Sequence, residues 1–210
     1  MIVRLAAALA AIAGVVVLLG YLYAIGKGPL APPAARHLRA MKDRLEPPAR
    51  LEPISFDEMR ALPHHAAPPE VAALERRGVA FEGYVEGMLR PSDGDIHLEV
   101  SPVAHGPDRP NGAYVSAEIT PQIRRGSTRW TYNELARAFR IRSGGTTPWE
   151  RGPRRVRIGG WLMFDFQYDS EPNEDAVHYA DVRVTGWEIH PVTSIELWND
   201  SLARFVELQR

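Results

Sequence analysis

Acidic side chains and a histidine alternate along a short stretch in the first half of the chain. These residues are Asp93, Asp95, His97 and Glu99. Carboxylates are the ligands that hard divalent cations prefer, whereas a transition metal would favour His97. His190 and Asp165 would complete a metal site if their strands met this stretch. The same residues can instead serve a turn and neighbouring strands, so we expect no cofactor and keep Asp93, Asp95 and His97 as candidate metal ligands.

Glu188 and His190 are spaced so that both side chains point to one face of a strand, where they could form a general acid–base pair. However, Pro191 places His190 in extended backbone at a strand end, where an imidazole can hydrogen-bond loop carbonyls. The chain has no cysteine, and it carries no nucleophile elbow, phosphate-binding glycine loop or zinc-helix signature. We therefore expect no catalysis. The alternative is a metal-dependent envelope hydrolase, with a nuclease-like reaction as one form of it, that uses Asp95, His97 and His190.

Arginine and tryptophan concentrate in the second half of the chain. Residues 124–157 hold ten arginines and two acidic residues, whereas residues 158–210 hold three arginines and ten acidic residues. OB folds bind single-stranded nucleic acid by combining a basic groove with aromatic side chains. The net charge of only −1 and the acidic half favour a protein or an envelope polymer as the partner, with single-stranded nucleic acid as an alternative. The residues predicted for this contact are Arg124, Arg125, Arg129, Trp130, Arg155, Arg157 and Trp161.

An uncharged run of 21 residues, 5–25, follows directly on the amino-terminal four. At about 1.5 Å per residue, a helix of this length crosses a hydrocarbon core about 30 Å thick. The run is longer than the apolar part of a cleaved signal peptide, and Leu22 stands where a small residue would be needed for cleavage after Ala24. We predict a single-pass inner-membrane anchor, residues 1–27, with a cleaved signal as the alternative. The scarcity of basic residues near the exit favours a periplasmic carboxy-terminal domain, whereas basic residues further on favour the reverse.

Residues 28–77 are predicted to form a proline-rich stalk with short helices. Six of the 18 prolines lie in residues 26–53 and prevent a continuous helix there. Ser55 and Glu58 have the spacing of a capping box, and Pro69 occupies a first-turn position of a second short helix.

From residue 79 onward, apolar and polar residues alternate with the period of two that is typical of strands. The expected strands are 79–89, 96–100, 113–120, 154–168 and 179–197, with a helix after Thr131 and a last helix that carries Leu202, Phe205 and Val206. Three strands, a helix and two strands are the element order of an OB-type barrel. Glycines at 83, 87 and 160 permit the sharp bends that a small barrel needs. We predict a mainly β, OB-like five-stranded barrel in a domain covering 78–210, with the helix between strands 3 and 4.

Four short segments of this chain, taken in their order, resemble a sequence pattern of a known group of proteins. They are 92–98 (SDGDIHL), 115–121 (VSAEITP), 158–166 (IGGWLMFDF) and 188–192 (EIHPV). The series resembles bacterial exported OB-like domain proteins of uncharacterised function, which share an SDGD…EI-P…E[IL]HPV pattern. The resemblance covers residues 79–198 and omits the arginine-rich insert after Pro121. It implies export and an OB-like fold, and no reaction. We therefore expect a membrane-anchored extracytoplasmic binding module.

Overall fold

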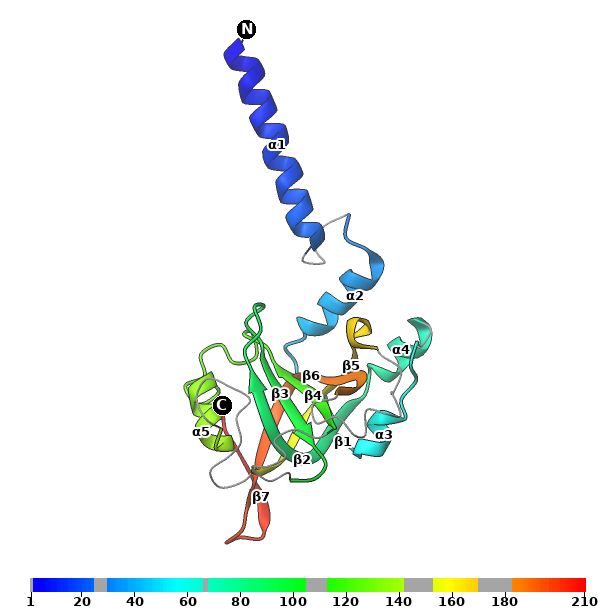
Figure 1. Cartoon of the computed structure of the whole chain (residues 1–210), viewed down its shortest axis with the longest axis vertical. Coiled ribbons are helices and arrows are strands. Elements are labelled where there is room, and N and C mark those ends of the chain that lie inside the picture. The colour runs from blue at the N-terminus through cyan, green and yellow to red at the C-terminus, as the bar shows by residue number, and fades with distance from the viewer. Residues whose placement is uncertain (1, 25–29, 66–67, 105–112, 142–152, 170–182) are drawn as a thin grey trace. The chain divides into compact units, whose positions relative to one another are not determined.

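The computed structural model describes the chain except residues 1, 25–29, 66–67, 105–112, 142–152 and 170–182 (Figure 1). The chain forms two compact units, Met1–Arg44 and Leu45–Arg210. The first unit contains the helices α1 (Ile2–Ala24) and α2 (Pro33–Lys42). Within the described residues, no helix has the length and apolar character required to span a membrane.

The second unit consists mainly of strands. Its described strands are β1 (Glu52–Ile54), β2 (Gly78–Leu89), β3 (Ile96–Ser101), β4 (Tyr114–Ile119), β5 (Arg155–Phe164), β6 (Arg183–Asn199) and β7 (Arg204–Glu207). Its described helices are α3 (Phe56–Arg60), α4 (Pro68–Leu74), α5 (Tyr132–Phe139) and the single 3-10 turn η1 (Phe166–Tyr168).

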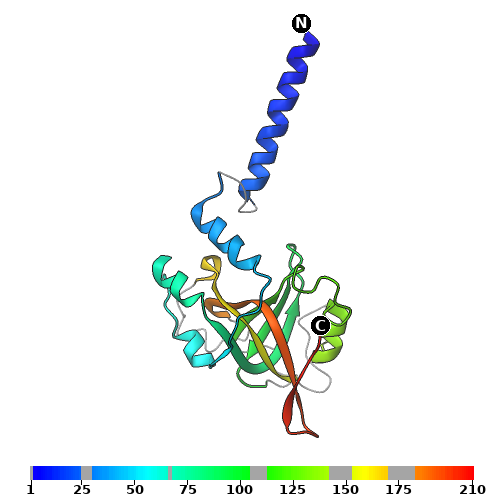
Figure 2. The ribbon, with the colours of Figure 1, turned by 180° about the vertical axis from the view of Figure 1, so that it is seen from behind.

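Five of these strands close into a barrel in the order β2-β3-β4-β6-β5, because β5 pairs back with β2 (Figure 1, and from behind in Figure 2). Neighbouring barrel strands are antiparallel except β4 and β6, which run parallel. Helix α5 lies in the chain between the third and fourth barrel strands. The predicted mainly β, five-stranded barrel is therefore confirmed.

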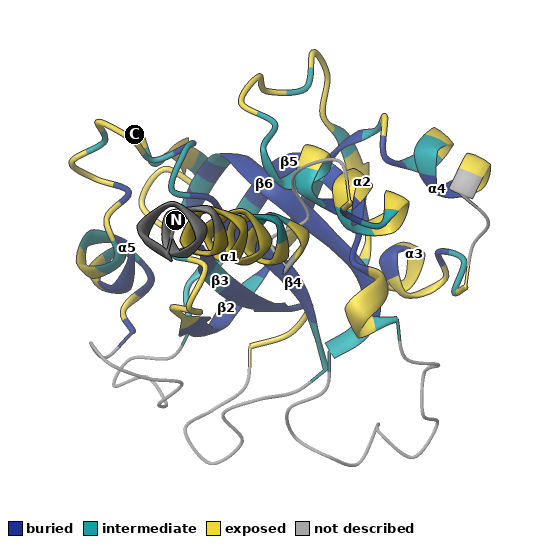
Figure 3. Ribbon diagram, turned by 90° about the horizontal axis from the view of Figure 1, so that it is seen from above, coloured by how far each residue is buried: buried dark blue, intermediate teal, exposed yellow. Residues whose placement is uncertain are grey.

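The alternation of apolar and polar residues separates the interior of the barrel from its exterior. Val79, Ile96, Val115 and Ile158 come from four different strands, are fully buried and belong to one core. Val184 of β6 is partly buried and packs against the same core. The strands that contribute this core are coloured as buried along most of their length in Figure 3.

Two glycines inside the barrel strands, Gly87 and Gly160, lie at irregularities of the strand pairing. The pairing register shifts next to Gly87 in β2 and on both sides of Gly160 in β5. A Cβ at Gly160 would collide with the carbonyl oxygen of Pro191, so only glycine lets β6 approach β5 this closely.

The described residues from 45 to 77 belong to the same compact unit as the barrel, Leu45–Arg210. Strand β1 pairs in parallel with β2, and Met59 of α3 and Val71 of α4 are buried in the barrel core. The capping box at Ser55 forms as predicted, with both reciprocal hydrogen bonds present. The prolines prevent a long helix here, but extended backbone between them can still pair with a strand.

The predicted carboxy-terminal helix is wrong. The chain turns after β6 and returns as β7, which pairs antiparallel with β6. Ala203 adopts a left-handed φ of 48°, and Phe205 packs edge-on against Trp198 with ring centroids 5.2 Å apart. Three apolar residues are too few to distinguish a helical period from a strand period, and the contact with Trp198 stabilises the strand.

Candidate functional site

Ionisable side chains gather on the outer face of β3, β4 and β6. Ile96, Ala117 and Ile189 point into the core, so the residues that alternate with them point outward. The strand pairing places His97 opposite Glu118 and Ser116 opposite Glu188. We call the following residues the acid–imidazole cluster: Asp95, His97, Glu118, Arg183, Glu188 and His190.

The members of the cluster are withdrawn from solvent although they lie outside the barrel core. His190 and Glu188 are 0 % exposed, and Asp95 and Glu118 are each 5 % exposed. His97 forms the more accessible edge, with 15 % of its side chain exposed. An ionised group that is buried without a partner costs on the order of several kcal/mol. The contacts between the members of this cluster therefore decide which of them are charged.

Glu188 links Arg183 to His190. Its Oε2 accepts a hydrogen bond from Arg183 Nη2 at 2.7 Å, and its Oε1 lies 2.8 Å from His190 Nδ1. Arg183 also donates to the backbone oxygens of Thr185 and Gly186, and its guanidinium stacks 4.4 Å from the centroid of the Tyr168 ring. These contacts fix the orientation of the Glu188 carboxylate and, through it, of the imidazole.

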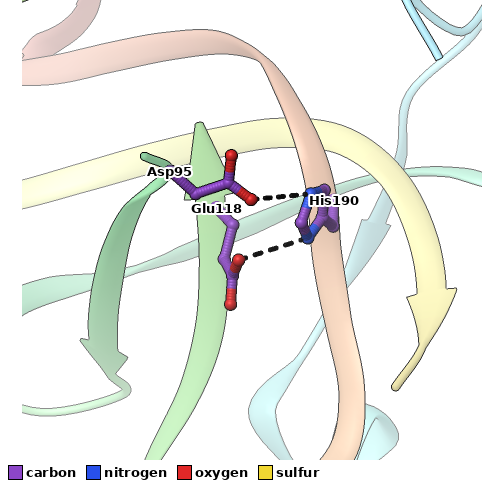
Figure 4. Close-up of side chains that lie close together, drawn as sticks. All are labelled: Asp95, Glu118 and His190. Atoms are coloured by element: carbon purple, nitrogen blue, oxygen red, sulfur yellow. Dashed lines mark ion pairs between the residues drawn. The ribbon is translucent and has the colours of Figure 1, made fainter. Parts of the chain in front are cut away.

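Two further carboxylates face His190 from neighbouring elements. Asp95 Oδ2 lies 3.5 Å from His190 Nε2, and Glu118 Oε2 lies 3.4 Å from His190 Nδ1 (Figure 4). Glu118 uses its other oxygen to contact His97 Nδ1 at 3.1 Å. One ligand atom each from Asp95, Glu118 and His190 falls within 4.8 Å of the others, a spacing that can hold a metal ion.

The structure brings together only some of the residues predicted for metal binding and catalysis. Asp95, His97, Glu188 and His190 all belong to the acid–imidazole cluster. The Asp93 side chain instead accepts a hydrogen bond from the backbone N–H of Asp95 and is exposed in the turn.

Asp165 also has a local structural role. It caps the 3-10 turn η1 by accepting from the backbone N–H of Gln167 at 3.0 Å. Although this carboxylate is buried, it is not in the group of three residues with metal-ligand spacing.

Glu118 and Arg183 are functional candidates that the sequence analysis did not find. Glu118 alternates with the outward Ser116 in the third barrel strand, so the period of two places it on the outer face. Pairing that strand with the second one would have placed Glu118 opposite His97. No local pattern indicates Arg183, which reaches Glu188 across five residues of the same strand.

The predicted arginines of β5 lie in an ion-pair network instead of standing free on the surface. Arg155 and Arg157 both contact Glu82, at 3.0 and 2.8 Å, and Arg157 also contacts Glu196 at 3.1 Å. Burial alone would raise the pKa of Glu82, but the hydrogen bonds from Arg157 and Arg155 outweigh it and lower that pKa. Burial likewise opposes the charged form of Arg157, but its bonds to Glu82 and Glu196 raise its pKa.

Two tryptophans of the predicted contact surface are engaged inside the fold. Trp130 is 1 % exposed, and its Nε1 donates to the backbone oxygen of Leu208 at 2.9 Å. Trp161 is half-buried, and its Nε1 donates to the backbone oxygen of Glu46 at 2.8 Å. Trp130 therefore presents no ring to a ligand at the surface.

The remaining arginines lie in the turns after β4. Arg124 donates to the backbone oxygen of Gly94, and burial together with the nearby Arg90 lowers its pKa. Arg125 and Arg129 are exposed. Arg155 and Arg157 lie instead on β5, between β2 and β6.

The acid–imidazole cluster is thus the chemically distinctive feature of the described barrel. Its arrangement can bind a cation, hold a proton between imidazole and carboxylate, or present charge to a ligand. No protein-family model and no curated protein sequence matches the chain.

Proposed function

We propose that this protein is a membrane-anchored, extracytoplasmic binding module with an OB-like barrel that binds its ligand on the outer face of β3, β4 and β6. The strand order and the helix between the third and fourth barrel strands support the OB-like part of this proposal. In OB folds, the face of the second and third strands and the adjoining loops bind ligands. Here those strands are β3 and β4.

The observation that carries the proposal is the burial of charge on that face. Outward positions of a barrel normally carry solvated polar side chains, yet Glu188 and His190 are fully buried there. If these residues only stabilised the fold, apolar residues of similar size would stabilise it as well or better. Ionisable groups concentrated in this way are typical of binding and catalytic sites.

The membrane part of the proposal rests on the sequence. Residues 5–25 contain no charged side chain and would reach across a bilayer as a helix. Lys27 is the only basic residue within ten positions after this run, which leaves little positive charge to retain the barrel in the cytoplasm.

Fusion of alkaline phosphatase after Arg210 tests the location. We expect an active enzyme that sediments with membranes and is released by detergent but not by alkaline carbonate. A matched fusion that lacks residues 1–27 should be inactive, because the barrel would not be exported. An inactive full-length fusion, or release by carbonate, would overturn the anchored and extracytoplasmic assignment.

In-cell photo-crosslinking tests the binding face. A photoreactive residue at His97, the accessible edge of the acid–imidazole cluster, should give a defined adduct. The same residue at Arg125 serves as a control, because this position is exposed on the turn after β4. An adduct at Arg125 with none at His97 would place the contact on the arginine-bearing turns instead.

A further inference from the structure

The hydrogen-bond partners of His190 define which of its nitrogens can bind a ligand. Nδ1 lies 2.8 Å from Glu188, a carboxylate that Arg183 holds in place. The short contact assigns the proton to Nδ1, which donates to Glu188. In the neutral imidazole, Nε2 then carries a lone pair that points toward the carboxylate of Asp95.

A lone pair that faces a carboxylate is repulsive unless a proton or a metal cation lies between the two atoms. The Nε2–Oδ2 separation is 3.5 Å. A charge-assisted N–H···O hydrogen bond would be shorter, about 2.7–2.9 Å. Two ligands at about 2.1 Å from a tetrahedral zinc ion lie about 3.4 Å apart, which matches the observed separation.

The third proposed ligand lies beside the same imidazole. Glu118 Oε2 lies 3.4 Å from His190 Nδ1, and one ligand atom each from Asp95, Glu118 and His190 falls within 4.8 Å of the others. Two carboxylates and one imidazole are donors that zinc binds.

We propose that Asp95, Glu118 and His190 bind a divalent transition-metal cation of the zinc class. His190 would bind through Nε2, while Glu188 and Arg183 orient its ring and His97 orients Glu118 through the 3.1 Å contact. Three protein ligands leave a fourth position for water or for a group of a bound partner. This inference rests on the proposed function, because it names the first ligand of the face assigned there.

The three ligands come from segments that the barrel holds rigidly. Asp95 directly precedes β3, Glu118 lies in β4 and His190 lies in β6 (Figure 4). The parallel pairing of β4 and β6 sets the separation of Glu118 and His190, so little reorganisation is needed when a cation enters.

Titration of the full chain with zinc in detergent tests the inference. After exhaustive treatment with a chelator, we expect one Zn²⁺ to bind per chain by calorimetry and elemental analysis, and Mg²⁺ to bind at least 100-fold more weakly. Cobalt should give the intense visible spectrum of a tetrahedral site. Asp95→Asn and Glu118→Gln should each weaken zinc binding by 100-fold or more.

Two variants separate ligands from other roles. Glu188→Gln should weaken zinc binding by about 10–100-fold without abolishing it, because this residue acts through His190. Glu82→Gln is the matched control, since it removes a carboxylate that pairs with Arg157 outside the cluster, and it should leave zinc binding unchanged. Circular dichroism establishes that each variant is folded.

Absence of stoichiometric zinc from folded protein would overturn the inference, as would zinc binding that Asp95→Asn leaves intact. Nitrogen NMR of His190 that shows both ring nitrogens protonated at neutral pH, even with excess zinc, would assign a proton to this position instead. Neither result affects the phosphatase fusion or the adduct at His97, so failure of the metal site is distinguishable from failure of the proposed function.

Discussion

Replacing Trp187 with phenylalanine tests whether residues 45–77 hold the barrel together or merely connect it to the preceding chain. Trp187 lies in β6 and is 0 % exposed. Its Nε1 donates to the backbone oxygen of Pro63 at 2.9 Å, and its ring lies 4.9 Å from that of Phe164. The side chain therefore ties the segment after α3 to the barrel.

The expected loss combines two effects. Phenylalanine cannot donate to the partly buried carbonyl of Pro63, and a typical hydrogen bond contributes about 0.5–1.5 kcal/mol. The smaller ring also gives up about 40 Å² of buried surface, worth about 1 kcal/mol at about 25 cal/mol per Å². Together these lower the free energy of unfolding by about 1.5–2.5 kcal/mol. With a urea m-value of about 2 kcal/mol/M, the midpoint falls by roughly 0.8–1.3 M.

Urea unfolding of the full chain in detergent, followed by far-ultraviolet circular dichroism, measures this loss. Trp198→Phe is the matched control, because Trp198 is half-buried on the same strand and packs by ring contact with Phe205. We expect the control to lose less than about 1 kcal/mol, as is usual for a substitution near the surface. Equal losses in the two variants would refute the idea that the Pro63 contact stabilises the barrel.

Three other predictions concern the barrel and its helix. Gly160→Ala should lower the free energy of unfolding by about 1–3 kcal/mol in the same urea assay, because the new methyl group collides with the backbone of β6. An unchanged urea midpoint would contradict the close approach of β5 and β6. Glu82→Gln should destabilise the protein at neutral pH by up to about 1 kcal/mol, as expected for a partly exposed pair with Arg157. The lowered pKa of Glu82 means that its contribution is present above its ordinary pKa and lost as the pH falls through the lowered value, so the difference between wild type and variant should shrink in acid. Arg140→Gly should raise the thermal midpoint slightly, by the equivalent of about 0.5–1 kcal/mol, because Arg140 ends α5 with a φ of 66° that glycine adopts without strain; Arg137→Gly inside the same helix should instead lower it.

The barrel could be predicted from sequence because its information is local. Each strand carries its own alternation of apolar and polar residues, and this alternation determines which side chains turn inward once the strand forms. Gly87 and Gly160 mark bends because a missing side chain is needed wherever another backbone approaches closely. The cap at Ser55 likewise involves residues three positions apart.

The candidate site could be predicted only in part. Asp95, His97, Glu188 and His190 were identified from residue type and spacing, but their partners were not. Glu118 is 23 residues from Asp95 and 72 from His190, so only the pairing of β4 with β3 and β6 brings it between them. The same limitation applies to the arginines of β5, whose partner Glu82 lies on the strand that closes the barrel.

By itself, the sequence determined the order of the five barrel strands with the helix between the third and fourth, the interior face of each barrel strand and an uncharged amino-terminal run. These features depend on neighbouring residues and on the fixed period of a strand or helix. Only the tertiary structure decided that residues 45–77 pack onto the barrel, that the chain ends in a strand, and that Glu118 and Arg183 join the acid–imidazole cluster. These outcomes depend on contacts between segments far apart in the chain, and such contacts form only when burial of the common core brings the strands into register.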